Sequence, residues 1–276
     1  MDIVIIGAQK SGTSWLFSML RQHPMSATAH VKEVHYFDKA GSAPHCLEQL
    51  DAWRSTLWQR PVARNREYAE YLHFALSPAL AFTDNWYKGI FDRKPMNRRK
   101  MAEYGEVFRL ESSPAYCVME ERRIQHFRQL MPECVPVLVI RDPADRLISA
   151  VNMIVGLTHG ADTWGVREQY AVLASEIAGR GEYSYAVPKW RRYFDDKLCL
   201  IPFGAIRRDP TWVLRKVERA AGLDPASYER MAKKRNSWTG QIEISAEIRR
   251  KVDEMVAPQY EYLVKEFGKD YLKEIV

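Results

Sequence analysis

The chain has 276 residues, of which 46% are hydrophobic and 28% charged, and its net charge is +6. This is the composition of a soluble globular protein, and it excludes a chain that is mostly disordered. The basic excess is modest and scattered, so it favours an anionic ligand and argues against nucleic acid as a partner.

The cysteines and the apolar stretches exclude further classes. Cys46, Cys117, Cys134 and Cys199 lie far apart and form no C-x-x-C pair, so we expect neither a zinc site nor a disulfide framework. No apolar stretch reaches the ~18 residues of a membrane span. The sequence enters "DIVIIG" without the charged region of a secretion signal. We therefore expect a cytoplasmic protein with no membrane span.

Short apolar runs alternate with helical patterns along the chain. We expect strands at 3–6, 26–29, 106–111, 135–140 and 198–203. The runs at 3–6 and 135–140 are rich in Val and Ile, which is typical of strands covered on both faces. We expect helices at 13–22, 118–130, 142–154, 210–221 and 244–266. This alternation predicts an α/β fold with a mostly parallel sheet.

Two stretches break the alternation. Residues 39–104 are rich in Trp, Tyr, Arg and His without a clear strand, so we interpret them as a helical insertion on the acceptor side of a single domain, 1–276. Within them, "RKPMNRRK" (93–100) is the densest basic run, and we interpret it as a solvated loop. Residues 156–184 contain five glycines, and we expect an irregular segment there.

The segment "GAQKSGTSW" (7–15) follows the first expected strand. A strand, a glycine turn and a helix start form an anion site, because the first N–H groups of the helix point outward and its dipole favours negative charge. Gly7 and Gly12 let the chain curl around a phosphate, and Lys10 projects from within the loop. A purely structural turn is the alternative interpretation of this stretch.

A kinase-like phosphotransferase is a second alternative. The nucleoside-triphosphatase loop has its lysine directly after the second glycine, where this chain has Thr13. Asp142 follows an apolar run and could be a magnesium-binding acid, but it stands between Arg141 and Pro143. The arginine puts a cation where magnesium would otherwise supply positive charge. A non-catalytic nucleotide-binding module is a third alternative.

Two segments together resemble the sulfotransferases that use 3′-phosphoadenosine 5′-phosphosulfate (PAPS): "GAQKSGTSWL" (7–16) and "VPVLVIRDPADRLISA" (135–150). The resemblance implies a three-layer P-loop-like fold with helices flanking the sheet. It implies that Lys10 reaches the oxygen between phosphate and sulfate, and that Arg141 and Ser149 bind the 3′-phosphate. A surface salt bridge with Asp145 is the alternative for Arg141. The loop residues implied in donor binding are Gly7, Gln9, Lys10, Ser11, Gly12, Thr13, Ser14 and Trp15.

A third segment, "KEVHYFD" (32–38), is similar to one in Golgi-class, heparan-sulfate-type sulfotransferases, where the glutamate is the proposed catalytic base. This similarity implies that Glu33 is the base, that His35 orients or assists it, and that Asp38 holds His35. An ordinary salt bridge between Glu33 and Lys32 is the alternative.

Further segments resemble the same subfamily and occur in its order: "DNWYKGIF" (84–91), "ESSPAY" (111–116), "GEYSYAVPKWRRYF" (181–194) and "KKRNSW" (233–238). They imply donor contacts from Tyr183, Lys233, Lys234 and Arg235. On the acceptor side they imply Lys32, Asp38, Trp86, Tyr87 and Ser112. Ser112 departs from the subfamily, many of whose members have a lysine there, and Lys32 or Arg21 would have to compensate. Because no Golgi anchor is present, the chain is more similar to a bacterial soluble member.

The predicted function is transfer of a sulfuryl group from PAPS to a hydroxyl or amine, leaving 3′-phosphoadenosine 5′-phosphate. We expect an in-line displacement that needs no metal. A glycan, a lipid, a natural product and a peptide tyrosine all remain open as acceptors. Residues 39–104 and 156–184 should decide among them, and the sequence does not predict the oligomeric state.

Overall fold

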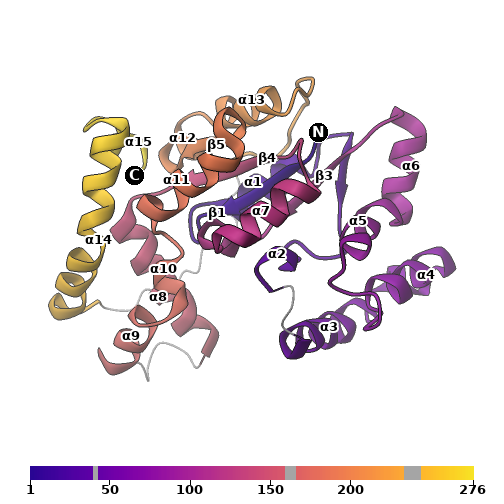
Figure 1. Cartoon of the computed structure of the whole chain (residues 1–276), viewed down its shortest axis with the longest axis horizontal. Coiled ribbons are helices and arrows are strands. Elements are labelled where there is room, and N and C mark those ends of the chain that lie inside the picture. Colours follow the sequence, from indigo (N-terminus) through magenta and orange to yellow (C-terminus); the bar gives the residue numbers. More distant parts are fainter. Residues whose placement is uncertain (40–42, 159–165, 233–243) are drawn as a thin grey trace.

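A parallel β-sheet forms the centre of the protein. The computed structural model describes residues 1–39, 43–158, 166–232 and 244–276 (Figure 1). Five strands lie in the order β2-β3-β1-β4-β5, and all the pairs are parallel. They are β1 (Ile3–Gly7), β2 (Ser26–Thr28), β3 (Phe108–Ser112), β4 (Val135–Ile140) and β5 (Cys199–Pro202). The predicted α/β fold with a mostly parallel sheet is confirmed.

Both faces of the sheet are covered by helices. Every residue of β1 and β4 is buried, as the Val- and Ile-rich runs predicted. On one face, Ile3 and Ile5 share a core with α1 (Thr13–Leu20) and α13 (Pro210–Ala220). On the other face, Val4 and Ile6 share a second core with α7 (Glu121–Leu130) and α11 (Tyr183–Phe194). The result is the expected three-layer arrangement (Figure 1).

The stretch expected to be a helical insertion is helical where the structure describes it. Its elements are α3 (Ala43–Leu57), a 3-10 turn at Pro61–Arg64, α4 (Arg66–Ala75), α5 (Asp84–Asp92) and α6 (Pro95–Tyr104). The rings of Trp53, Phe82 and Trp86 stack on one another between these helices. The same aromatic cluster is continuous with the core on the Val4 side of the sheet.

The prediction of a solvated loop at 93–100 is wrong. Residues 95–100 belong to α6, and the polar side chains of its N-cap Lys94 and of Asn97 and Lys100 turn back onto the edge strand β2. Lys94 Nζ donates to the carbonyls of Thr28 at 3.0 Å and Ala29 at 2.9 Å. Asn97 also donates to Thr28, and Lys100 donates to Ser26. These bonds satisfy carbonyls that an edge strand would otherwise leave unpaired.

The prediction of an irregular segment at 156–184 is also wrong for the residues that the structure describes. The segment contains the end of α8 (Pro143–Thr158), together with α9 (Val166–Leu173) and α10 (Glu176–Gly179). α8 begins as predicted, because the Asp142 carboxylate accepts the N–H of Asp145 at 2.9 Å. α8 and α9 pack on α14 (Ala246–Phe267) through a third apolar cluster, which favours helix over loop.

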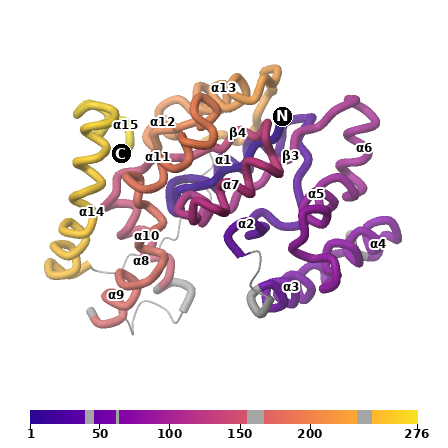
Figure 2. The backbone as a smooth tube through the Cα atoms, viewed as in Figure 1, coloured from indigo at the N-terminus to yellow at the C-terminus, as the bar shows by residue number. Residues whose placement is uncertain are grey.

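The remaining elements connect or finish the fold. They are α2 (Tyr36–Lys39), α12 (Phe203–Arg208), α15 (Tyr271–Glu274) and 3-10 turns at Pro114–Val118 and Asp195–Lys197. Figure 2 shows α2 beside α7, although about 85 residues separate them in sequence. None of the helices in the described ranges has the length and apolarity of a membrane span.

The strand order places a reversal at the centre of the sheet. From β1 the chain builds β2 and β3 on one side and then β4 and β5 on the other. In open α/β sheets, ligands bind beyond the carboxyl ends of the strands at such a reversal. The loop after β1, the segment after β2 and the residue after β4 all leave from this edge, and they carry most of the predicted site residues.

Candidate active site

The loop between β1 and α1 has the geometry of an anion site. Lys10 and Gly12 have left-handed backbone conformations, with φ of 69° and 80°. A side chain at Gly12 would be strained by this conformation, and its Cβ would lie 2.8 Å from Ile206 Cδ1 and 3.3 Å from the ring of Phe203. α1 starts at Thr13, and its N-cap residue Gly12 has no side chain to accept a hydrogen bond from the helix start.

Arg141 reaches this loop from the end of β4. Its Nη1 donates to the carbonyl of Lys10 at 2.8 Å, and its guanidinium lies over the ring of Phe203, 4.7 Å from the centroid. Its Nε is buried without a hydrogen-bond partner. Asp145 forms no ion pair with it among the described residues, so the surface salt bridge is not observed.

The two cations beside the loop are Lys10 and Arg141. Neither Lys10 nor Arg141 forms an ion pair with a carboxylate in the part of the chain that the structure describes. Burial and the charge of Arg141 lower the pKa of the Lys10 ammonium. A bound anion would relieve this repulsion, so the geometry and the charge point to the same ligand class.

Tyr183 lies behind Arg141. Its side chain is buried, its hydroxyl accepts the N–H of Arg141 at 3.0 Å, and it donates to the Arg141 carbonyl at 2.9 Å. Tyr183 therefore fixes the backbone that carries the Arg141 guanidinium. This contact differs from the predicted one, which was with the sulfuryl donor PAPS. Ser149 is half-buried in the second turn of α8, and its predicted role stays a prediction.

Trp15 belongs to the core beneath α1. It is 5% exposed, and its indole N–H donates to the carbonyl of Met231 at 2.8 Å. This contact differs from the expected donor contact, and it attaches the chain near residue 231 to the helix of the phosphate loop. The predicted donor residues Lys233, Lys234 and Arg235 lie outside the described residues.

Glu33, His35 and Asp38 form a chain of polar contacts after β2. His35 Nδ1 lies 2.8 Å from Asp38 Oδ2, so the predicted support of His35 by Asp38 is confirmed. His35 Nε2 lies 3.5 Å from Glu33 Oε2, and Lys32 Nζ donates to Glu33 Oε1 at 2.7 Å. The Glu33 side chain is 42% exposed, so one of its faces remains accessible to an acceptor.

These contacts determine the charges of the segment. Burial alone would raise the pKa of Glu33, but hydrogen bonds from His35 and Lys32 lower it to about 2. Burial opposes the charge on His35, but hydrogen bonds to Asp38 and Glu33 raise its pKa to about 9. At neutral pH the segment therefore contains a carboxylate at Glu33 and an imidazolium at His35.

Three predicted acceptor-side residues lie beneath the surface. Trp86 and Tyr87 are each 1% exposed, and their polar atoms are bonded to the Ala75 carbonyl and to Glu111. Ser112 is fully buried, and its N–H donates to the Lys32 carbonyl at 3.2 Å. The prediction that these side chains contact an acceptor is therefore wrong, because large aromatic and small buried groups here support the segment from below.

Lys32 fills the role expected of a compensating cation better than Arg21 does. Lys32 contacts Glu33 directly, whereas Arg21 is exposed at the end of α1.

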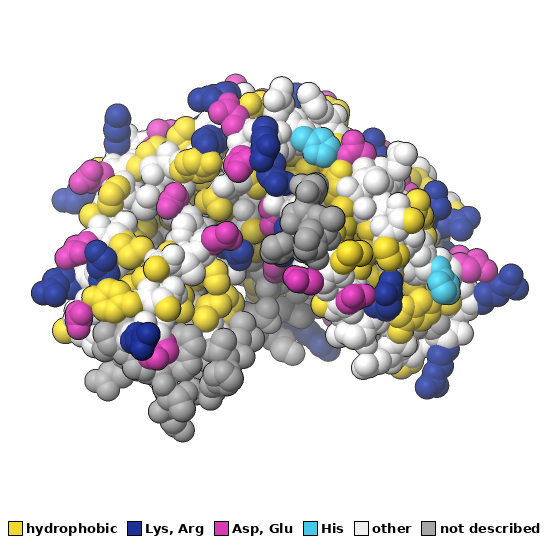
Figure 3. Space-filling model, turned by 60° about the horizontal axis from the view of Figure 1, so that its bottom comes forward, with side chains coloured by type: hydrophobic (Ala, Val, Ile, Leu, Met, Phe, Trp, Pro, Cys, Tyr) yellow, Lys and Arg dark blue, Asp and Glu magenta, His cyan; other side chains and the backbone are white. Residues whose placement is uncertain are grey.

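On the face in Figure 3, Lys and Arg side chains are interspersed with Asp and Glu and form no continuous basic stripe.

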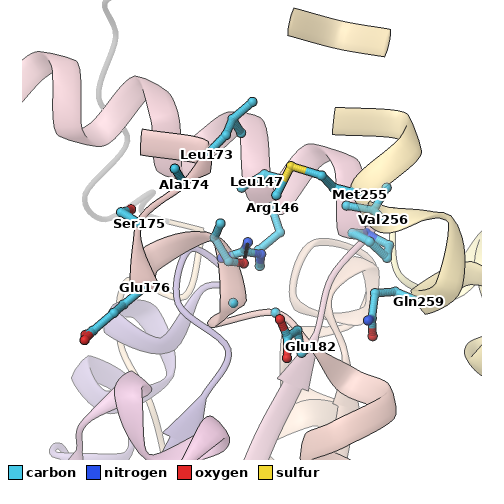
Figure 4. Close-up of a pocket in the computed structure, with 14 residues that line it drawn as sticks. Arg146, Leu147, Leu173, Ala174, Ser175, Glu176, Glu182, Met255, Val256 and Gln259 are labelled. Atoms are coloured by element: carbon cyan, nitrogen blue, oxygen red, sulfur yellow. Dashed lines mark hydrogen bonds between the residues drawn. The ribbon is translucent and has the colours of Figure 1, made fainter. Parts of the chain in front are cut away.

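A cavity of about 460 Å³ lies elsewhere, between α8, α10 and α14 (Figure 4). Arg146 is buried at its wall and donates to the carbonyls of Ile177 and Ala178 at 3.1 and 2.6 Å. A Cβ at Gly181 would lie 2.3 Å from Arg146 Nε, so the glycine is required there. The lining residues that the structure describes include none of the predicted site residues, and Arg146 stabilises the turn before Tyr183.

Sequence reasoning missed two residues of the site. Phe203 ends the run 198–203 and contacts both Gly12 and Arg141; its place at the carboxyl end of a strand was the available signal. Glu111 lies inside "ESSPAY" and accepts hydroxyl groups that also bind the backbone after Glu33. No local pattern distinguishes it from a surface glutamate.

The comparisons with known proteins agree with this geometry. A family model described as "Sulfotransferase family" matches residues 2–230. The chain therefore belongs to the sulfotransferase family, and it has the transferase activity of that family. No curated protein sequence gives a significant match.

One solved structure of a bacterial sulfotransferase has a similar fold. A sulfotransferase from Alicyclobacillus acidocaldarius superposes with a TM-score of 0.62 at 19% identity, over 96% of this chain and 94% of that one. A Mycobacterium avium sulfotransferase gives 0.45 at 16% identity, over 96% of this chain and 76% of that one. The sulfotransferase domain from the curacin biosynthetic pathway gives 0.47 at 13% identity, over 99% and 95%. The particular resemblance to Golgi-class enzymes stays a prediction.

Proposed function

We propose that this sulfotransferase takes its sulfuryl group from PAPS and transfers it to a hydroxyl or amine, with Glu33 as the general base. The observation that carries the proposal is the meeting of Lys10 and Arg141 at the start of α1, with no carboxylate paired to either of them in the described ranges. Glu33 lies in the segment that follows β2 at the same edge of the sheet.

The residues at this edge suit a donor with phosphates at both ends of a ribose. The loop N–H groups with Lys10 would hold the 5′-phosphate, and Arg141 with Ser149 would hold the 3′-phosphate. The buried Nε of Arg141 has no hydrogen-bond partner among the described residues. Phe203 presents an apolar ring beside both groups, next to Gly12.

The donor supplies the sulfuryl group, and the side chains manage charge and protons around it. Glu33 receives the proton of the acceptor hydroxyl while the acceptor oxygen bonds to sulfur. The bond from sulfur to the 5′-phosphate oxygen breaks, and Lys10 stabilises the negative charge left on that oxygen. Positioning of these groups provides most of the rate enhancement, as in phosphoryl transfer.

The low pKa of Glu33 constrains this mechanism. A carboxylate with a pKa of about 2 is a weak base, and general bases work best near the operating pH. Lys32 Nζ donates to Glu33 Oε1 at 2.7 Å, and a lysine side chain is flexible enough to leave this contact. We infer that Lys32 moves from Glu33 to the sulfuryl oxygens when the donor binds. The pKa of Glu33 then rises once the donor is bound, because the carboxylate loses its contact with the Lys32 ammonium.

The kinase-like alternative is less consistent with Asp142. One carboxylate oxygen caps α8, and the other accepts the hydroxyl of Tyr260 at 2.7 Å. An acid engaged in this way is poorly placed to hold magnesium.

The test is a panel of acceptors with PAPS carrying radioactive sulfate. We expect label in at least one hydroxyl or amine acceptor, and none with E33Q protein. Calorimetry should detect binding of 3′-phosphoadenosine 5′-phosphate in EDTA and no binding of ATP–magnesium. Tight binding of ATP–magnesium with none of the bisphosphate would overturn the proposal.

A further inference from the structure

Glu111 is a buried carboxylate next to the end of β3. It is 1% exposed and accepts three hydroxyl groups. Ser113 and Tyr116 donate to its Oε1 at 2.6 and 2.8 Å, and Tyr87 donates to its Oε2 at 2.6 Å. Burial of a carboxylate costs free energy, and these three hydrogen bonds offset that cost.

Two of these hydroxyl groups connect Glu111 to the segment that carries Glu33. The N–H of His35 donates to Ser113 Oγ at 3.3 Å, and the N–H of Tyr36 donates to the Tyr116 hydroxyl at 2.8 Å. Each hydroxyl has one hydrogen, and Ser113 and Tyr116 both donate theirs to Glu111. Glu111 therefore draws both hydrogens inward and turns both oxygens toward the backbone N–H groups.

The backbone at this point is one that needs support. His35 has φ of 55°, a left-handed conformation that residues with a side chain disfavour. The same conformation aims the imidazole at Glu33 on one side and Asp38 on the other. A small change in φ at His35 would move the ring away from one of the two carboxylates.

Tyr87 provides an internal comparison. Its hydroxyl donates to Glu111, as that of Tyr116 does, but no hydrogen bond from the described backbone reaches it. Its ring stacks on Tyr36 at 4.9 Å, just as the Tyr116 ring packs against Phe37 at 5.7 Å. Both tyrosines are fully buried. Replacing either by phenylalanine keeps the ring and removes one donor to Glu111, but only Y116F also breaks a bond to the segment.

We propose that Glu111 is a positioning residue for sulfuryl transfer: through the hydroxyl groups of Ser113 and Tyr116, it holds the backbone at His35 and Tyr36 so that His35 contacts Glu33. The proposal rests on the proposed function for its kinetic consequence, but the position of His35 can be measured without any turnover.

The experiment compares Y116F with Y87F, and adds E111Q and S113A. The first readout is the titration of His35 followed by NMR, with H35Q used to assign the signal. We expect Y116F, S113A and E111Q to lower the pKa of His35, and Y87F to leave it unchanged. The melting temperature should fall more in Y116F, which loses the bond to Glu111 and the bond from the Tyr36 N–H, than in Y87F, which loses only the bond to Glu111.

The second readout is kinetic. We expect Y116F and E111Q to lower kcat by about tenfold to a hundredfold, since misplacement of a catalytic group by ~1 Å has effects of this size. Their KM for the donor and their affinity for 3′-phosphoadenosine 5′-phosphate should stay close to those of the wild type, and Y87F should match the wild type in both.

Two results would overturn the proposal: equal losses of kcat in Y87F and Y116F, or an unchanged His35 titration in Y116F, S113A and E111Q. Failure of the wild type to transfer sulfate to any acceptor would instead overturn the proposed function, and the NMR titrations would still decide on Glu111.

Discussion

The cations of the phosphate loop differ from those of the segment 32–38 in what neutralises them. Lys10 and Arg141 lie together without a carboxylate partner among the described residues, whereas Lys32 and His35 are paired with Glu33 and Asp38. The first region is ready for an anion from outside. The second is already neutral within itself, so it must exchange partners before it can act as a base. Binding and catalysis should therefore respond to different substitutions.

The sharpest way to separate the two regions is E33Q. The amide keeps the shape of Glu33 and removes the base, so we expect kcat to fall by about a hundredfold to ten-thousandfold. Affinity for 3′-phosphoadenosine 5′-phosphate should stay within about twofold, because Glu33 is not part of the anion site. Turnover assays and calorimetry on the same preparation measure both quantities. Near-normal turnover would exclude Glu33 as the base.

R141A tests the other region. Loss of a charge-assisted contact should weaken binding of 3′-phosphoadenosine 5′-phosphate by about tenfold to a hundredfold. Adenosine 5′-phosphate lacks the 3′-phosphate, so its affinity should change much less. K10A is the matched control, because it should weaken both nucleotides. Equal losses for both nucleotides in R141A would contradict the assignment of Arg141 to the 3′-phosphate.

K32M would remove one of the two contacts that lower the pKa of Glu33; the other, the hydrogen bond from His35, is the larger and would remain. We expect the pKa of Glu33 to rise from about 2 toward its ordinary range, because a cation that favours the carboxylate is lost. The acid limb of the kcat/KM profile, which reports the free enzyme, should move to higher pH. At neutral pH kcat should fall if Lys32 also serves the sulfuryl oxygens. A K32M profile that superposes on that of the wild type would exclude the proposed exchange.

D38N should have the smallest effect, and it concerns His35. Loss of the carboxylate should lower the His35 pKa from about 9 by about 1 to 3 units. Because the folded pKa of His35 lies above its ordinary 6.5, its stabilising effect is complete below pH 6.5 and disappears as the pH rises through 9. The difference in melting temperature between wild type and D38N should therefore be larger at pH 6 than at pH 10. A difference that is independent of pH would contradict the assignment of charge to His35.

Prediction from sequence succeeded where a signal is local. The runs at 3–6 and 135–140 became β1 and β4, and Asp142 caps α8 as its position before Pro143 indicated. Prediction failed at "RKPMNRRK" and at Trp86 and Tyr87. Charged and aromatic residues are typical of surfaces and clefts, but here α6 turns Lys94 onto β2, and helix packing buries both rings.

The sequence alone therefore determined the parallel sheet, the glycine loop after β1 and the cation after β4, because each depends on short-range periodicity, glycine conformation and helix capping. Only the tertiary structure decided that Arg141 reaches Lys10, that Phe203 lies against Gly12, and that Glu111 supports the backbone at His35. These contacts join residues 76 to 191 positions apart. They arise from strand order, which brings the carboxyl ends of separate strands to one edge and leaves no mark in any single stretch of sequence.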